Sequence, residues 1–259
     1  MGTPDVSPAI STPYIFGTSV VGPLHVQLNI PCQDACSFRP LPCSAAAIAV
    51  CDGLGSASKS DVGARLAANA AVETAQNMLV DPELSGAEIV RTAVLAARRS
   101  LEAKAAEDQC PLRDLACTII IVVARKDQLV AAHIGDGAVV ALTENGLQLV
   151  SGPGESEYSN EVTPLTSSQW EETLRLSSVI NDVRCVAVFT DGCQRAAFRK
   201  SANGIEPFQR FFGPIFEYAN ELPDPTEAGQ EIHALLTSTK LCENSEDDKT
   251  LVVAVLSRG

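Results

Sequence analysis

Aspartate-glycine pairs follow short apolar runs at three places in the sequence. The pairs are Asp52-Gly53 after AAAIAVC, Asp136-Gly137 after AAHIG and Asp191-Gly192 after CVAVFT. Each pair taken alone is typical of an ordinary turn, because Asp-Gly is a common turn dipeptide. Three such pairs at the ends of apolar strands instead indicate a sheet edge that carries several carboxylates and could form a site.

Further acids stand beside apolar runs. Asp247-Asp248 comes just before TLVVAVLS, and Asp34 in NIPCQDAC precedes another possible strand. Carboxylates about 4 Å apart repel by roughly 4 kcal/mol at an effective dielectric constant near 20, so such a cluster needs a cation. Oxygen ligands without paired His or Cys favour Mg²⁺, Mn²⁺ or Ca²⁺ over zinc. The histidines, His25, His133 and His233, are too scattered for a zinc site.

The first half of the chain predicts two long helices followed by an antiparallel meander. Apolar residues at helical spacing predict helices over 61–80 and 86–108, separated by Asp81-Pro82. The period then changes, and β-rich runs predict strands over 116–125, over 128–142 with a break at 135–137, and over 146–150. The Asn145-Gly146 dipeptide is a strong hairpin signal between the last two runs.

The second half adds a strand over 184–190, helices about 208–219 and 226–238, and a final strand over 250–257. The order of strands, long helices, strands, helices and strand favours an α+β layered architecture over a doubly wound parallel sheet. We expect one domain over 1–259, with a flexible segment at 1–14. Residues 151–179 show no clear period, so they are predicted to form a flap over the site.

Composition excludes several classes of function. The chain of 259 residues carries a net charge of −13, with 19 Lys and Arg against 32 Asp and Glu, which argues against nucleic acid as a partner. It has no apolar run of about 18 residues that could span a membrane and no secretory signal at its start. Nine irregularly spaced cysteines indicate buried thiols in a reducing cytoplasm. Cys51 and Cys193, beside two of the Asp-Gly pairs, are interpreted in this way.

Five motifs occur in an order that resembles the metal-dependent protein phosphatase 2C family in its compact bacterial form. They are NIPCQDAC, IAVCDGLGSASKSDVGARLAA, AAHIGDGAVVAL, VAVFTDGCQRA and EDDKTLVVAV, and the resemblance covers about residues 17–256. It implies a four-layer α-β-β-α sandwich, in which two antiparallel sheets are flanked by helices. It also implies a site for two Mn²⁺ or Mg²⁺ ions at one end, with a weaker third ion in some bacterial members.

The resemblance assigns roles to four of the candidate positions around the two ions. Asp52 matches the carboxylate that bridges both metals, and Gly53 matches the residue that offers its carbonyl to one of them. Asp191 and Asp247 match acids that belong to the other metal. In this scheme a water activated by both ions attacks phosphorus in line, without a covalent enzyme intermediate.

The remaining acids match positions at the margin of the family's metal site. Asp34 matches an early acid that lies close to the metals and is often reached through water. Asp136 matches the acid that helps to hold the third ion. Together with Asp52, Asp34 is therefore a candidate catalytic residue.

The sequence departs from the family at two positions. The family's phosphate-binding Arg is replaced by Asn29, and Leu54 stands where eukaryotic members carry a His thought to act as general acid. His25, expected in the preceding strand, is a candidate phosphate contact, and an ordinary strand residue is the alternative. Arg195 and Arg199 are interpreted as solvated helix residues, with attraction of phosphate as the alternative.

The sequence therefore predicts a cytoplasmic, monomeric, Mn²⁺- or Mg²⁺-dependent phosphomonoesterase. Its substrates would be phosphoserine and phosphothreonine in proteins, and a serine/threonine kinase would be a further partner. A sensor or scaffold that has lost turnover is the alternative, favoured by the missing Arg and His but opposed by the presence of the acids. A Ca²⁺-binding module is disfavoured because no contiguous loop of alternating acids is present.

Overall fold

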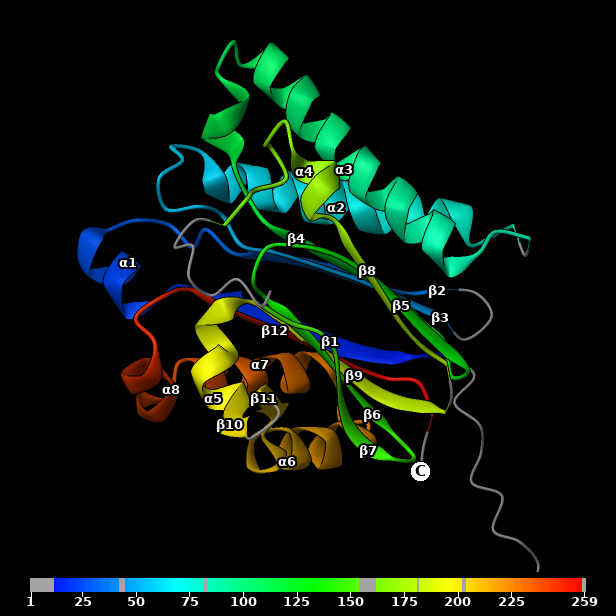
Figure 1. Cartoon of the computed structure of the whole chain (residues 1–259). Coiled ribbons are helices and arrows are strands. Elements are labelled where there is room, and N and C mark those ends of the chain that lie inside the picture. The colour runs from blue at the N-terminus through cyan, green and yellow to red at the C-terminus, as the bar shows by residue number, and fades with distance from the viewer. Residues whose placement is uncertain are drawn as a thin grey trace, which may run out of the picture.

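Two five-stranded antiparallel sheets pack face to face, and helices cover both outer faces (Figure 1). This arrangement confirms the predicted four-layer α-β-β-α sandwich. The computed structural model describes residues 12–41, 45–81, 83–153, 162–180, 182–201 and 204–257. Most of the segment predicted to be flexible, residues 1–11, lies outside this range, and β1 begins at Tyr14.

The first sheet has the strand order β1-β12-β9-β6-β7. Its strands are β1 (Tyr14–Val20), β12 (Lys249–Val255), β9 (Val183–Phe189), β6 (Ala138–Thr143) and β7 (Gly146–Ser151). Helices α6 (Gln209–Asn220) and α7 (Pro225–Leu236) cover its outer face (Figure 1). The predicted hairpin joins β6 to β7, where Gly146 adopts a φ of 98° that favours glycine.

The second sheet has the order β2-β3-β4-β5-β8. Its strands are β2 (Ala35–Leu41), β3 (Ala45–Cys51), β4 (Ile119–Ala124), β5 (Gln128–Ile134) and β8 (Arg175–Ile180). The predicted long helices α2 (Ser60–Met78) and α3 (Gly86–Glu107) cover it. A capping box fixes the start of α3, because Ser85 and Glu88 satisfy each other's backbone N–H groups.

The sandwich has one core between the sheets and one under each helical layer. Between the sheets, Ile48 and Val122 of one sheet and Val186 and Val252 of the other belong to a single fully buried cluster. Every residue of β3 is buried, because sheet and helices cover its two faces. A continuous apolar run, rather than an alternating one, is the pattern expected of such a strand.

Shorter elements connect these layers. They are α1 (Pro23–Leu28), η1 (Leu112–Leu115), α4 (Trp170–Thr173), η2 (Asp191–Cys193), α5 (Gln194–Ala197), β10 (Phe198–Ser201), β11 (Gly204–Pro207) and α8 (Thr239–Asn244). None of the described helices combines the length and apolar character that crossing a bilayer requires.

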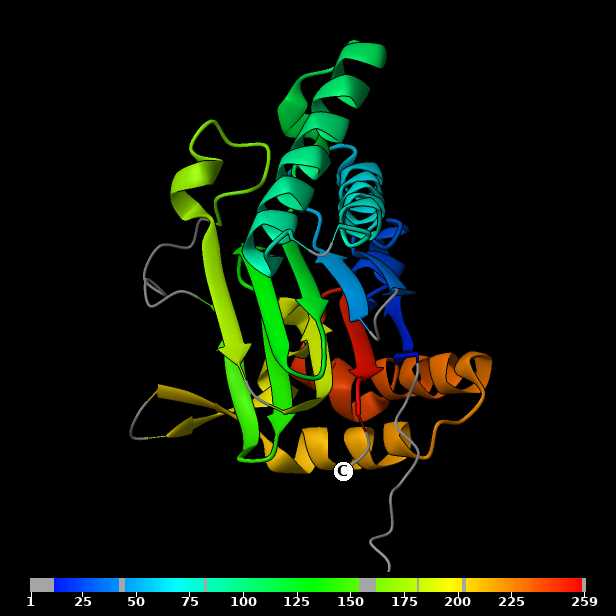
Figure 2. The same cartoon turned by 90° about the vertical axis from the view of Figure 1, so that its right-hand side faces the viewer.

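The prediction of an irregular flap over 151–179 is wrong for its last part. Residues 154–161 lie outside the described range, but α4 and β8 are regular, and β8 is the edge strand paired with β5 (Figure 2). Leu165 is fully buried, and Trp170 packs against the core under α2 and α3. These contacts hold the segment against the sheet and the helical layer.

The strand register brings the predicted acids to one end of the sandwich. Phe189, at the end of β9, pairs with Leu251 of β12 and with Ala138, the first residue of β6. In the other sheet, Val50 near the end of β3 pairs with Ile120 near the start of β4. The acids follow β3, β5 and β9 and precede β12, so they emerge at this common end.

Candidate active site

Three of the predicted carboxylates meet in a pocket of about 850 Å³. Asp52, Asp136 and Asp191 each place an oxygen within 4.8 Å of the other two. Asp52 follows β3, Asp136 lies between β5 and β6, and Asp191 opens η2 after β9. The trio therefore combines the ends of strands from both sheets.

Burial and the charges of neighbouring acids raise the pKa of each carboxyl group in this trio. For Asp52 burial is the largest cause of the raised pKa, followed by the charges of Asp34 and Asp191. Burial, and then the charges of Asp136 and Asp247, raise the pKa of Asp191 to about 6. Burial also raises the pKa of Asp136. The cluster is thus costly to ionise without a cation.

The donor set of the trio fits a hard divalent cation. Oδ1 of Asp191 is buried and has no hydrogen-bond partner among the described residues. No Lys or Arg in the described part of the chain forms an ion pair with any of the three acids. Clustered carboxylate oxygens without His or Cys are the ligands of Mg²⁺, Mn²⁺ and Ca²⁺.

Gly53 also lines the pocket, in a position that leaves no room for a side chain. Its N–H donates to the carbonyl of Gln33 at 3.1 Å. A Cβ at residue 53 would lie 2.7 Å from that carbonyl oxygen and 2.8 Å from Cβ of Ser60. Close backbone approach, rather than an unusual φ, therefore requires glycine beside Asp52.

Asp34 lies behind the pocket and is not among the residues that line it. Its Oδ2 accepts hydrogen bonds from the hydroxyls of Thr190 at 2.7 Å and Thr250 at 2.8 Å. Burial raises the pKa of Asp34 well above its ordinary value, although both hydroxyl contacts lower it. The structure therefore places this predicted residue behind the trio rather than within it.

Asp247 lines the pocket from the segment before β12, but it is exposed and outside the tight trio. Its backbone carbonyl accepts a hydrogen bond at 2.7 Å from Nζ of Lys249, a fully buried side chain. The sequence reasoning did not identify Lys249, because a lysine that begins a strand carries no signal of burial.

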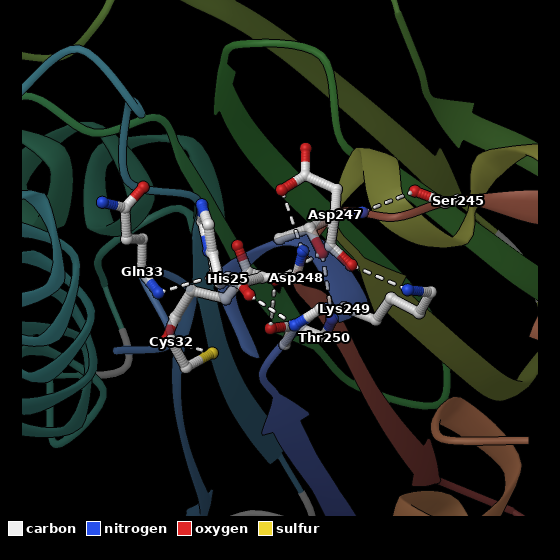
Figure 3. A network of polar contacts seen from close by, with 11 residues as sticks. His25, Cys32, Gln33, Ser245, Asp247, Asp248, Lys249 and Thr250 are labelled. Atoms are coloured by element: carbon white, nitrogen blue, oxygen red, sulfur yellow. Dashed lines mark hydrogen bonds and ion pairs between the residues drawn. The ribbon is translucent and has the colours of Figure 1, made fainter. Parts of the chain in front are cut away.

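His25 lies in the helix α1, so the expectation of a strand at this position is wrong. It lines the pocket, and its Nδ1 lies 2.9 Å from Oδ2 of Asp248 (Figure 3). The sequence places Asp248 beside Asp247 before the last strand but indicates no role for it. Adjacent acids do not reveal which one faces the pocket.

The structure also shows where the two positions that depart from the family and the two candidate arginines lie. Asn29 ends α1 with a left-handed φ of 56°, and Leu54 lines the pocket. Among the described residues that line it, Arg195 and His25 are the only basic ones. Arg199 lies instead in β10, where it pairs with an exposed glutamate at 3.5 Å.

The two thiols beside the Asp-Gly pairs are buried, as predicted. Cys51 and Cys193 have no exposed surface. Burial is the largest cause of a raised pKa in both thiols. They are therefore poor nucleophiles, because the reactive form of cysteine is the thiolate.

Comparison with known proteins identifies the family. The family model described as protein phosphatase 2C matches residues 21–237. The chain belongs to the protein phosphatase 2C family. It is 33% identical over 251 residues to serine/threonine-protein phosphatase 3 of Escherichia coli (strain K12), which covers 92% of this chain and 96% of that relative. The predicted class, a metal-dependent serine/threonine protein phosphatase, is the class of this family.

Solved structures show the same fold at low identity. The catalytic domain of the serine/threonine phosphatase PstP, in complex with two manganese ions, is similar with a TM-score of 0.63 and 16% identity, over 94% of this chain and 98% of that one. A structure of PstP/Ppp from Mycobacterium tuberculosis has a TM-score of 0.65 and 17% identity, over 95% of this chain and 100% of that one. The four-layer sandwich is thus the fold of this phosphatase family.

Proposed function

We propose that this protein hydrolyses phosphoserine and phosphothreonine in proteins at a site for two Mn²⁺ or Mg²⁺ ions. The observation that carries the proposal is the trio of carboxylates within 4.8 Å, with a buried and unpartnered oxygen and no ion pair among the described residues. The E. coli relative is named as a serine/threonine phosphatase, and the PstP structure holds two manganese ions. Both facts support the proposal.

Asp52, Asp136, Asp191 and Asp247 would hold the ions, together with the carbonyl of Gly53. When bound, divalent ions would supply positive charge that neutralises a phosphate and would activate a water molecule as the nucleophile. An ion at the trio would also remove the repulsion that raises the carboxyl pKa values, so metal binding should release protons.

Residues around these acids would support the metal ligands and position the phosphate of the substrate. Asp34, held by two threonine hydroxyls, supports the trio from behind and would reach an ion only through water. His25 and Arg195, the basic residues of the pocket wall, are available to contact the phosphate. Leu54 offers no proton donor, so the leaving oxygen would take its proton from water.

The test is phosphate release from a phosphothreonine peptide with Mn²⁺, with EDTA as the metal-free condition. Asp52→Asn should lower turnover by orders of magnitude. Asp127→Asn is the matched control, because Asp127 is exposed in the turn between β4 and β5 at the other end of β4. A folded, metal-loaded wild type without turnover on peptides or aryl phosphates would contradict the proposal and favour the sensor or scaffold.

Other predictions from the sequence stay predictions. They are the single domain over 1–259, the monomeric state, the cytoplasmic location, a serine/threonine kinase partner and a third metal ion. The charge of −13 remains consistent with the absence of a nucleic-acid partner.

A further inference from the structure

The helix α1 carries His25 into the pocket although no residue of the helix is buried. Hydrogen bonds from its backbone N–H groups and from Gly22 attach it to the segment before β12. The N–H of Leu24 donates to the carbonyl of Glu246 at 3.1 Å, and the N–H of Gly22 donates to Oδ1 of Asp248 at 2.6 Å. Polar contacts to residues 246–248 therefore position α1.

Asp248 is the centre of these contacts. Its side chain is 2% exposed. Its Oδ1 accepts the N–H of Gly22, and its Oδ2 accepts the N–H of Gln33 at 2.6 Å and lies 2.9 Å from Nδ1 of His25 (Figure 3). Because a carboxylate can only accept hydrogen bonds, Nδ1 of His25 would be the donor in this contact.

This arrangement fixes the chemistry of the other ring nitrogen. With Nδ1–H committed to Asp248, the neutral imidazole presents Nε2 as an acceptor, and the protonated imidazole presents it as a donor. In Figure 3 one edge of the imidazole points away from Asp248, and His25 lines the pocket that holds Asp52 and Asp191. Nε2 is thus the nitrogen available to a ligand in the pocket.

We propose that Asp248 is a positioning residue that fixes the tautomer and orientation of His25, so that Nε2 contacts the phosphate of the substrate. The contact with phosphate rests on the proposed function, whereas the control of the tautomer does not. Asp248 would then act through His25 rather than on the substrate. A purely structural role, in which Asp248 only fastens α1 to β12, is the competing explanation.

Nitrogen NMR of the metal-free protein tests the first step without any activity measurement. With His25→Asn used to assign the resonances, neutral His25 should show a protonated Nδ1 and an unprotonated Nε2. In Asp248→Asn the population should move toward the Nε2–H form, because the amide can donate to the ring. An Nε2–H tautomer in the wild type, or an unchanged tautomer in Asp248→Asn, would overturn the proposal.

Kinetics of the Mn²⁺-loaded enzyme test the second step. Asp248→Asn should lower kcat/KM by about 10- to 100-fold, by analogy with the loss found when a partner that orients a metal-ligating histidine is removed. His25→Asn keeps a donor near the position of Nδ1 but removes Nε2, so it should lose activity while it keeps its melting temperature. The double variant should be no slower than His25→Asn alone, because both changes interrupt one pathway.

The outcomes distinguish a positioning role of Asp248 from a purely structural one. If Asp248→Asn slows the His25→Asn enzyme as much as it slows the wild type, Asp248 does not act through His25 and the proposal fails. A wild type that lacks phosphatase activity contradicts the proposed function and the phosphate contact. The NMR result would still decide whether Asp248 sets the tautomer, so the two failures are distinguishable.

Discussion

Replacing Asp52 by Asn should stabilise the metal-free protein while it removes the response to Mn²⁺. At 4.8 Å and an effective dielectric constant near 20, two unit charges repel by roughly 3.5 kcal/mol. Asp52 faces two such charges, but the raised pKa values favour protonation of the carboxyl groups, which relieves part of this repulsion. We therefore expect a gain of about 1–3 kcal/mol at neutral pH, or roughly 3–10 °C in melting temperature for a chain of this size.

Thermal unfolding with EDTA and with Mn²⁺ measures both halves of this prediction. In EDTA the wild type should be less stable than Asp52→Asn. In Mn²⁺ it should be more stable than this variant, because an ion that binds only the folded state stabilises that state by mass action. Asp52→Asn should change little between the two conditions. The control Asp127→Asn should follow the wild type in both, since residue 127 is exposed and remote from the pocket.

The advantage of Asp52→Asn in EDTA should also shrink as the pH is lowered through about 6. Asp191 has a folded-state pKa raised to about 6, so its protonated form favours the fold at low pH, and this stability is lost as the pH rises through that value. The reasoning is refuted if Asp52→Asn is less stable than wild type in EDTA at neutral pH and still gains stability from Mn²⁺.

Three further changes test the surroundings of the site. Burial lowers the pKa of His133 to about 3, so its neutral ring contributes stability that is present above about pH 6.5 and is lost as the pH falls. Between about pH 6 and 4 this loss should amount to about 1.4 kcal/mol per pH unit. Denaturation measurements over this range should show that His133→Asn removes this pH dependence. Gly22→Ala would place Cβ 2.2 Å from the carbonyl carbon of Asp247, so displacement of α1 should reduce both the melting temperature and kcat/KM. Thr250→Val removes a hydroxyl 2.8 Å from Oδ2 of Asp34, and urea denaturation should show a loss of about 1–3 kcal/mol.

The sequence predicted well those elements whose hydrophobic pattern matches their burial in the structure. The apolar run that became β3 is buried at every position, and the alanine-rich runs became α2 and α3 against the same sheet. Because these strands end in Asp-Gly, the approximate location of Asp52, Asp136 and Asp191 followed from the order of elements. Their separation of less than 4.8 Å did not, since it depends on how the two sheets pack.

The helix α1 shows why the rest could not be predicted. Leu24, Val26 and Leu28 alternate with polar residues, which is the period of a half-buried strand. In the structure they belong to a helix and are 43%, 61% and 58% exposed, so these three side chains do not form a buried face. Proline at the start and a left-handed Asn29 at the end favour the short helix instead.

The role of Asp248 could not be predicted for a different physical reason. Its partners Gly22, His25 and Gln33 are more than 200 positions away in the chain, and the pairing of β1 with β12 brings the segment that follows β1 beside it. Asp247 and Asp248 are adjacent, yet one lines the pocket and the other is buried against α1. The same short segment therefore carries a residue of the pocket wall and the acid that contacts Nδ1 of His25.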